Sequence, residues 1–237
     1  MKSFLKYLQE SFISPNNGAR YGQVIFLVGG AASGKSTAIR KFIDSGSYKI
    51  LNPDDVKELV KKAAEKGHTA FSDLAGVNPY EPEGAAKFHQ KLRDTKISSR
   101  YSRRLTSDPH RSELPNLLFD RTFSFAGEIE KISNSLRRAG YDPNNIHIVY
   151  VFTDVEVAVQ QNRDRERKLK DEIIVSTNKG AKQNFIDLLF QRMRAAPVNG
   201  DYFMVTNNKV IKIKEAGKRL DREGNIARKV LSIISGD

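Results

Sequence analysis

The stretch Gly29-Gly30-Ala31-Ala32-Ser33-Gly34-Lys35-Ser36 decides the fold of this chain, because it matches the pattern G-x-x-x-x-G-K-[ST] in full. Residues 24–28 before it are apolar throughout, and residues 35–43 after it have a helical pattern. A strand, a glycine-rich loop and a helix in this order place backbone N–H groups around an anion at a helix N-terminus. The sequence therefore predicts a phosphate-binding loop.

The residue types within this loop suit the phosphates of a nucleotide. Glycines let the backbone fold around the anion, Lys35 can reach the β- and γ-phosphates, and the Ser36 hydroxyl can bind Mg²⁺. A chance glycine-rich turn is the alternative, and the flanking strand and helix argue against it. The predicted nucleotide-binding residues are Gly29, Gly30, Ala31, Ala32, Ser33, Gly34, Lys35, Ser36 and Thr37.

Further strands and helices alternate along the chain on both sides of the loop. Apolar runs predict strands at residues 24–28, 48–51, 117–120, 146–152 and 202–206. Helical patterns follow at residues 35–43, 55–66, 85–105 (one helix or a pair), 125–139, 155–170, 184–194 and 226–234. This order predicts an α/β fold of the P-loop NTPase, nucleoside-kinase-like class, with a parallel sheet and helices on both faces. Ligands of such sheets bind at the carboxyl ends of the strands.

The same patterns predict how the chain is divided. Residues 1–22 are expected to form an amphipathic helix and a linker, and residues 23–237 the main domain. Within that domain, residues 55–115 are too long for a simple crossover and are expected to form a helical insert between the second and third strands. Residues 160–182 are rich in arginine and are expected to form a lid.

Composition limits the classes of function. The chain has 237 residues, a formal net charge of +12 and no cysteine. The missing cysteines exclude disulfides, thiolate catalysis and cysteine-bound metals. No apolar run reaches the length of a membrane span, and no secretory signal is recognisable, so we expect a cytoplasmic protein without a membrane partner. The positive charge favours anionic partners such as nucleotides, nucleic acid or acidic metabolites, with solubility alone as the alternative.

Four segments in the same order resemble zeta-toxin-like P-loop kinases, of which polynucleotide kinases and other small-molecule kinases are relatives. These segments are residues 29–37, 52–54, 119–122 and 163–167, and the resemblance covers residues 24–206. Only the phosphate loop is specific by itself, and the order of the others completes the case. The resemblance implies a kinase that uses ATP and Mg²⁺.

Two aspartates follow predicted strands. The resemblance implies that Asp54 accepts the proton of the acceptor hydroxyl, as a carboxylate near the γ-phosphate can do. Asp54 or its neighbour Asp55 would alternatively cap the next helix. Asp120 occupies the position of an acid that supports Mg²⁺ together with Ser36, or else caps the element that follows. Arg121 departs from the family pattern of an acid, a small residue and a threonine.

Arginines are concentrated after the fourth predicted strand. Arg163 and Arg167 lie one helical turn apart and share a predicted face, without local acidic partners on it, whereas Arg165 points elsewhere. The resemblance implies that this segment closes over ATP and that Arg163 and Arg167 neutralise charge on the transferred phosphoryl group. The alternative is a solvated helix of mixed charge.

The predicted insert carries a basic stripe. Arg93, Arg100 and Arg104 have spacings close to one helical face, which suits a phosphate-bearing acceptor or a nucleic-acid backbone as well as it suits a solvated basic helix. The expected acceptor-binding residues are Asp54, Arg100, Arg104, Arg121 and Thr122.

The expected function is transfer of the γ-phosphate of ATP to a hydroxyl of a nucleotide-sugar, a nucleic acid or a modified base. The alternatives are a P-loop ATPase that drives a partner and a silent ATP-dependent nucleic-acid-binding protein. The sequence leaves open whether a protein inhibitor binds. Residues 1–10 resemble the short leaders of capsid-associated proteins of tailed phages, which would add the host cytoplasm or the virion as locations.

Overall fold

The computed structural model describes residues 13, 20–97, 100, 114–165, 169–190, 198–218 and 225–235. It divides into two compact units, one of residues Met1–Ile50 and Ser112–Asp237 and one of residues Leu51–Arg111. The predicted N-terminal helix and the leader-like segment lie outside the described residues. No helix among those described is long and apolar enough to cross a membrane.

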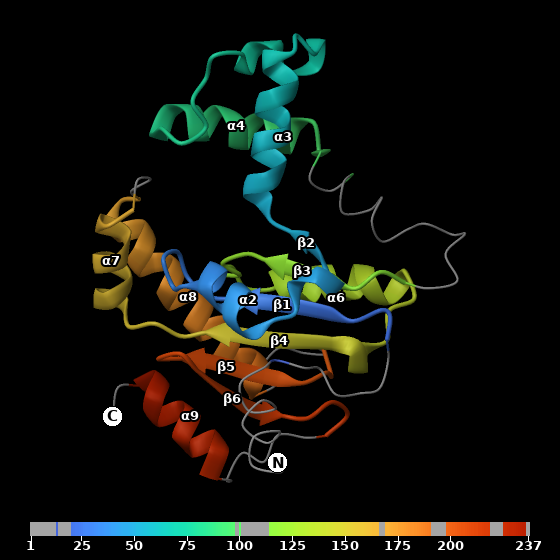
Figure 1. Cartoon of the computed structure of the whole chain (residues 1–237), viewed down its shortest axis with the longest axis vertical. Coiled ribbons are helices and arrows are strands. Elements are labelled where there is room, and N and C mark those ends of the chain that lie inside the picture. Colours follow the sequence, from blue (N-terminus) through green and yellow to red (C-terminus); the bar gives the residue numbers. More distant parts are fainter. Residues whose placement is uncertain are drawn as a thin grey trace. The chain divides into compact units, whose positions relative to one another are not determined.

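The first unit is built on a six-stranded sheet with the strand order β2-β3-β1-β4-β5-β6 (Figure 1). Strand β1 pairs in parallel with β3 and β4, and β4 pairs in parallel with β5. The strands are β1 (Val24–Val28), β2 (Lys49–Leu51), β3 (Leu117–Asp120), β4 (Ile146–Val151), β5 (Tyr202–Thr206) and β6 (Lys209–Lys214). The predicted α/β class with a largely parallel sheet is confirmed, and the antiparallel edge strand β6 was not predicted.

The central strands are apolar because both of their faces are covered. Every residue of β1 is fully buried, as are most residues of β3 and β4. Phe26 of β1 stacks on Phe119 of β3 with ring centroids 5.1 Å apart, and it meets Phe123 edge-on at 5.3 Å. This packing fixes the carboxyl ends of β1 and β3 beside each other.

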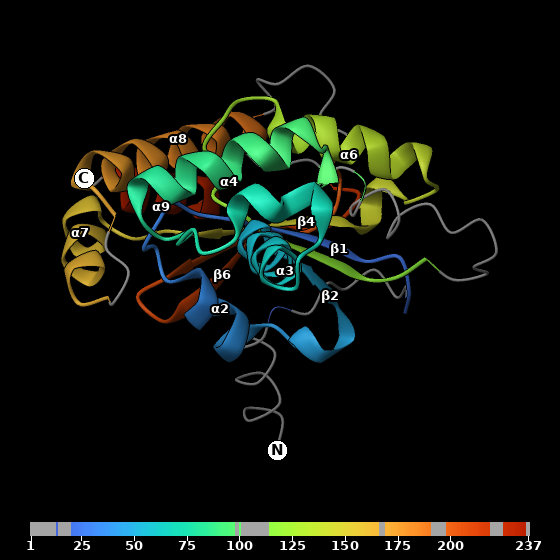
Figure 2. The ribbon, with the colours of Figure 1, turned by 90° about the horizontal axis from the view of Figure 1, so that it is seen from above.

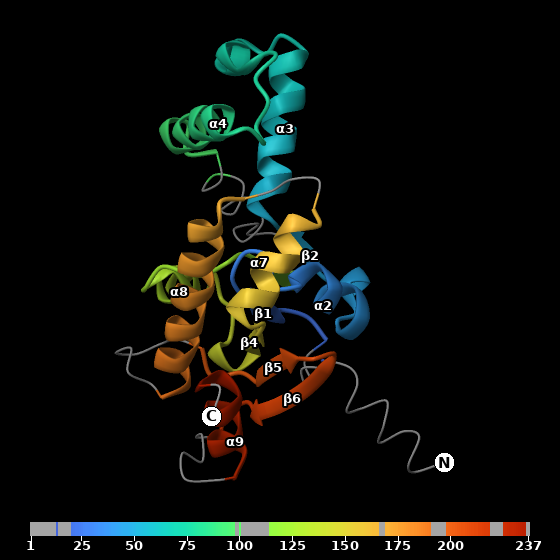
Figure 3. The ribbon, with the colours of Figure 1, turned by 90° about the vertical axis from the view of Figure 1, so that its left-hand side faces the viewer.

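Helices cover both faces of this sheet. Figures 2 and 3 show α2 (Lys35–Phe42) on one face and α6 (Glu128–Arg138), α8 (Asp171–Leu189) and α9 (Asn225–Ser235) on the other. Helix α7 (Val155–Arg163) follows β4 and contacts α8. Ala38 and Phe42 of α2 pack with Ile25 and Leu27 of β1, and the described N-terminal residue Ile13 joins this cluster.

The second unit is helical. It contains α3 (Pro53–Glu65), the 3-10 helix η2 (Thr69–Leu74) and α4 (Pro82–Asp94). The core of this second unit consists of Val56, Val60, Ala64, Phe71, Leu74, Phe88 and Leu92. Two further 3-10 helices, η1 (Ser45–Ser47) and η3 (Pro143–Asn145), belong to the first unit. The predicted insert of residues 55–115 overlaps the second unit.

Several predicted helices have other bounds in the structure. The helix predicted at residues 155–170 ends at Arg163, and the one predicted at residues 184–194 begins earlier, at Asp171. The one predicted at residues 125–139 begins at Glu128, after Gly127 with a φ of 75°. Helix α4 ends at Asp94, and Lys96 has a φ of 51°, so the helical face expected to join Arg93 to Arg100 is interrupted.

Candidate functional site

The phosphate loop follows β1 as predicted and leads into α2. Two of its residues take the left-handed backbone conformation, Ala32 with a φ of 60° and Gly34 with a φ of 86°. Such residues turn successive N–H groups to the inner side of a loop and make it a cradle for anions. The Ser33 hydroxyl is buried in this loop, and no group of the described residues bonds with it. This geometry fits a phosphate ligand.

Lys35 lies folded onto the loop that it belongs to. Its Nζ atom donates hydrogen bonds to the carbonyl oxygens of Gly29 at 2.8 Å and Gly30 at 2.9 Å. The next residue, Ser36, is exposed in the first turn of α2. The ammonium group is thus held at the loop, within reach of any anion that the loop binds.

A pocket of about 340 Å³ continues from the phosphate loop. Ser33, Gly34 and Thr37 line one side of it, and residues of α2, α7 and the ends of β4 and β5 also line it. The β5–β6 turn closes the pocket with Asn207 and Asn208, both left-handed, and Lys41 donates a hydrogen bond of 3.1 Å to Asn208 Oδ1. A volume of this size is typical of small-molecule sites. Thr153, another lining residue, donates a 2.8 Å hydrogen bond to the Ser33 carbonyl.

Asp120 ends β3 in parallel register with Leu27 of β1, next to the start of the phosphate loop. It is 8% exposed. The residues after it form a fixed loop, because Asn184 of α8 donates a 2.7 Å hydrogen bond to the Phe123 carbonyl. Arg121 pairs with Glu128 at 3.1 Å, and the Thr122 hydroxyl lies 3.4 Å from that of Ser124. A carboxylate thus stands at the strand end where the sequence predicts a metal-supporting acid.

The metal that this fold class implies fits these residues only in part. Among the described residues, no group of three or more His, Asp or Glu side chains could hold a metal ion. A Mg²⁺ ion in proteins usually keeps several waters and is bound through one or two side chains together with substrate phosphates. Ser36 and Asp120 would supply those side chains, and the ion would neutralise charge on the phosphates.

Asp54 belongs to the second unit and stands in the first turn of α3. The N-cap of this helix is Asn52, whose Oδ1 accepts a 2.9 Å hydrogen bond from the Asp54 N–H, so neither Asp54 nor Asp55 is the cap. The Asp54 carboxylate is half exposed and accepts a 2.8 Å bond from Lys57, which is buried. The Asp54 side chain therefore pairs with Lys57 and does not cap the helix.

The arginines after β4 differ from the prediction. Arg163 is the last residue of α7 and pairs with Asp171 of α8 at 3.3 Å, an acidic partner that was not predicted. Arg165 lines the pocket. Arg167 lies outside the described residues. The predicted lid also overlaps the first part of α8, a helix with Ile174 and Ala181 fully buried.

Of the basic stripe in the second unit, Arg100 is described and exposed, and Arg104 lies outside the described residues. Arg93 donates a 2.7 Å hydrogen bond to Gln90 on its own helix.

Sequence reasoning missed the contribution of α8 to the phosphate loop. Thr177 accepts a 3.1 Å hydrogen bond from the Ala31 N–H, and Asn178 donates a 2.9 Å bond to the Ala31 carbonyl. No local sequence pattern predicts these contacts, because the residues that they join are separated by 146 and 147 positions in the sequence.

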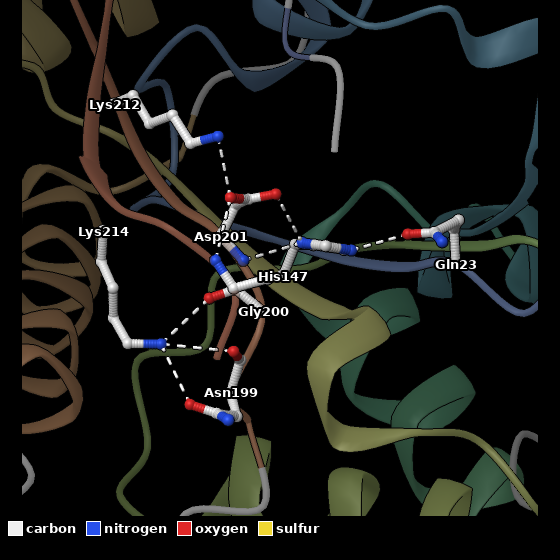
Figure 4. Close-up of polar contacts among 8 residues, drawn as sticks. Gln23, His147, Asn199, Gly200, Asp201, Lys212 and Lys214 are labelled. Atoms are coloured by element: carbon white, nitrogen blue, oxygen red, sulfur yellow. Dashed lines mark hydrogen bonds and ion pairs between the residues drawn. The ribbon is translucent and has the colours of Figure 1, made fainter. Parts of the chain in front are cut away.

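A second polar cluster lies at the amino ends of β4 and β5 (Figure 4). His147 is fully buried, its Nδ1 accepts a 2.9 Å bond from the Asp201 N–H, and its Nε2 lies 2.7 Å from Gln23 Oε1. Lys212 pairs with Asp201 at 2.9 Å, and Lys214 donates bonds to Asn199 and Gly200. Burial lowers the pKa of His147 and that of Lys214. These groups fix the amino ends of β4 and β5 and are no part of the candidate site.

The parallel sheet and the phosphate loop between β1 and α2 define a P-loop nucleotide-binding protein. The family described as AAA domain matches residues 24–185, and the chain belongs to this family. No curated protein matches this chain.

Three solved structures illustrate the similarity of this fold to known proteins. A structure from the PezAT chromosomal toxin–antitoxin system of Streptococcus pneumoniae is similar, with a TM-score of 0.53 and 14% identity over 99% of this chain and 91% of that one. A structure of AvrRxo1-ORF1 with AvrRxo1-ORF2 and sulphate ions has a TM-score of 0.56 and 12% identity over 97% and 71%. The corresponding structure with ATP has a TM-score of 0.53 and 17% identity over 97% and 66%.

Proposed function

We propose that this protein is an ATP- and Mg²⁺-dependent kinase that transfers the γ-phosphate to a hydroxyl of a nucleotide-sugar, a nucleic acid or a modified base. The observation that carries the proposal is the pocket continuous with the phosphate loop. It offers a place for a base and ribose beside a cradle for the phosphates. The fold shared with a complex whose description includes ATP supports ATP as the nucleotide.

In this proposal Lys35 leaves the carbonyls of Gly29 and Gly30 and binds the β- and γ-phosphates. Ser36 and Asp120 would hold Mg²⁺, and the ion would neutralise charge on these phosphates. Arg165 and Gln161, which line the pocket, face the bound nucleotide. Asp54 accepts the proton of the attacking hydroxyl, and Arg163 and Arg167 neutralise charge on the phosphoryl group. The proposed acceptor-binding residues are Asp54, Arg100, Arg104, Arg121 and Thr122.

An ATPase coupled to a nucleic-acid or protein partner is the second candidate. The observation in its favour is the ion pair of Asp54 with the buried Lys57, because a carboxylate stabilised in its charged form is a weaker proton acceptor.

The test is phosphoryl transfer from γ-labelled ATP with Mg²⁺ to uridine-diphosphate sugars, to 5′-hydroxyl DNA and RNA, and to hydroxymethylated DNA. The variants are Lys35→Ala and Asp54→Asn, with Asp55→Asn as the matched control, because Asp55 is the exposed neighbour on the same helix. We expect label on one acceptor class, lost by about a hundredfold or more in the first two variants and retained in the control. Label released only as free phosphate, at the same rate in Asp54→Asn, would replace the kinase by the ATPase.

A further inference from the structure

Helix α8 forms hydrogen bonds with the phosphate loop at Ala31, and these bonds satisfy both backbone polar groups of that residue. Asn178 Nδ2 donates to the Ala31 carbonyl at 2.9 Å and to the Ile174 carbonyl of its own helix at 2.8 Å. Thr177 Oγ1 donates back to the Ile173 carbonyl at 2.7 Å, so its lone pairs are left to accept the Ala31 N–H at 3.1 Å. The two neighbouring side chains thus bind the loop as a strand partner would.

The lack of space around Gly30 shows how closely Asn178 packs against the phosphate loop. A Cβ atom on Gly30 would lie 2.2 Å from Cγ and 2.4 Å from Oδ1 of Asn178. The pattern G-x-x-x-x-G-K-[ST] leaves this position free, so the pattern itself does not require a glycine at residue 30. The Asn178 carboxamide occupies the volume that any other side chain at position 30 would need.

Helix α8 is firmly anchored against the sheet. Helix α8 has Ile174, Ala181 and Phe185 fully buried, and Phe185 stacks on Tyr150 of β4 with ring centroids 4.4 Å apart. A helix anchored in this way holds Thr177 and Asn178 at fixed positions relative to the sheet and to the loop that follows β1.

In the proposed function, the support that Lys35 gives to this part of the loop is removed when a nucleotide binds. Lys35 holds the Gly29 and Gly30 carbonyls in the free protein, and the proposed function moves its ammonium group to the phosphates. The bonds from α8 do not involve the ammonium group of Lys35. These bonds therefore remain and hold the first half of the loop in its phosphate-binding shape. Because the loop is already ordered, nucleotide binding loses less free energy in ordering it.

We infer that Thr177 and Asn178 are positioning residues that fix the phosphate loop through Ala31, and that Gly30 and Asn178 form one coupled pair. This inference rests on the proposed function only so far as the loop binds a nucleotide, and it is independent of the acceptor.

The first test compares Thr177→Val with Thr177→Ser by titration with fluorescent ADP and Mg²⁺. Valine keeps the shape of threonine and leaves the Ala31 N–H without its acceptor, whereas serine keeps the hydroxyl. We expect Thr177→Val to weaken ADP binding by about fivefold or more and Thr177→Ser to bind within about twofold of the unmodified protein. Gln183→Ala, at an exposed position of α8, controls for changes in the helix itself.

The second test is a cycle of Gly30→Ala, Asn178→Ala and the double variant, read by the same titration. We expect Gly30→Ala to weaken ADP binding by about tenfold or more, and the double variant to bind no worse than Asn178→Ala, because the second change removes the atoms that collide. Thermal unfolding of each variant separates weak binding from misfolding.

The outcomes are distinguishable. Equal affinities of the Val and Ser variants, or a double variant whose loss is the product of the single losses, would overturn the inference while the proposed function stands. An unmodified protein that binds neither ADP nor ATP would overturn the proposed function, and the inference with it.

Discussion

The fold restricts the ionisation of His147. It is buried among the Asp201 backbone, Gln23 and the charged groups of Asp201, Lys212 and Lys214, and its pKa is lowered, mainly by burial. The unfolded chain, with an ordinary histidine pKa of about 6.5, then binds more protons than the folded one as the pH falls. The contribution of His147 to stability is therefore complete above that pH and is lost below it.

We expect the free energy of unfolding to fall between pH 7.5 and pH 5.5, at up to about 1.4 kcal/mol per pH unit from this residue. The measurement is urea denaturation at several pH values for the unmodified protein and for His147→Gln. The variant should be less stable at pH 7.5 and should show a smaller slope. Identical slopes in both proteins would show that other groups cause the pH dependence.

Gly34 and Gly30 are both in the phosphate loop, but they are glycines for different reasons. Gly34 has a φ of 86°, and no atom of the described residues lies within 4 Å of the place that a Cβ would take, so only its backbone conformation disfavours a side chain. We expect Gly34→Ala to lower the free energy of unfolding by about 1–2 kcal/mol in chemical denaturation, the cost of a left-handed alanine. Unchanged stability would mean that the loop relaxes to another conformation.

At the scale of elements, one asparagine joins α7 to α8. Asn162, 2% exposed, donates from Nδ2 to the Leu169 carbonyl at 2.8 Å, and its Oδ1 accepts the Leu169 N–H at 3.0 Å. This pair of bonds closes the connection between the two helices and sets where α8 begins.

Asn162→Asp keeps the acceptor and replaces the donor by a second acceptor that faces a carbonyl. We expect a loss of about 1–3 kcal/mol in the free energy of unfolding and faster amide exchange at the start of α8. Hydrogen exchange followed by mass spectrometry checks this. A loss of stability without faster exchange at residues 169–174 would place the effect elsewhere.

The elements that the sequence predicted are those with local patterns. Strand β1 is a continuous apolar run, β4 is apolar except for His147, and the phosphate loop is a contiguous motif. The first half of α8 escaped prediction because Thr177, Asn178 and Gly180 weaken its helical pattern. Gly180 is explained by a close approach, since a Cβ there would lie 2.4 Å from the Ser124 carbonyl oxygen.

The other features that were not predicted also lack a local sequence pattern. Strand β6 carries lysines at both ends and one fully covered apolar residue, Ile213, so it lacks the apolar run of a central strand. The contacts of Thr153, Thr177 and Asn178 with the phosphate loop depend on packing between distant segments. Such contacts leave no spacing rule in the sequence.

For the whole molecule, a ligand that binds only the folded state must raise the temperature of unfolding. We expect ATP with Mg²⁺ at about 100 times its dissociation constant to add about 2.7 kcal/mol of stability. For a chain of this size that corresponds to a rise of about 5–10 °C in the unfolding midpoint. Differential scanning fluorimetry measures it, with Lys35→Ala as the variant that should lose most of the rise. An equal rise in that variant would place the nucleotide elsewhere than in the phosphate loop.

The contact between Ala31 and α8 also bears on how the protein is made. Ala31 is separated from Asn178 by 147 positions, and β1 pairs with β3 and β4, which are both encoded after it. A growing chain that has left the ribosome only as far as β4 therefore has the motif but not the helix that holds it. Nucleotide capture is therefore expected to appear late in synthesis, once α8 has emerged and docked on the phosphate loop.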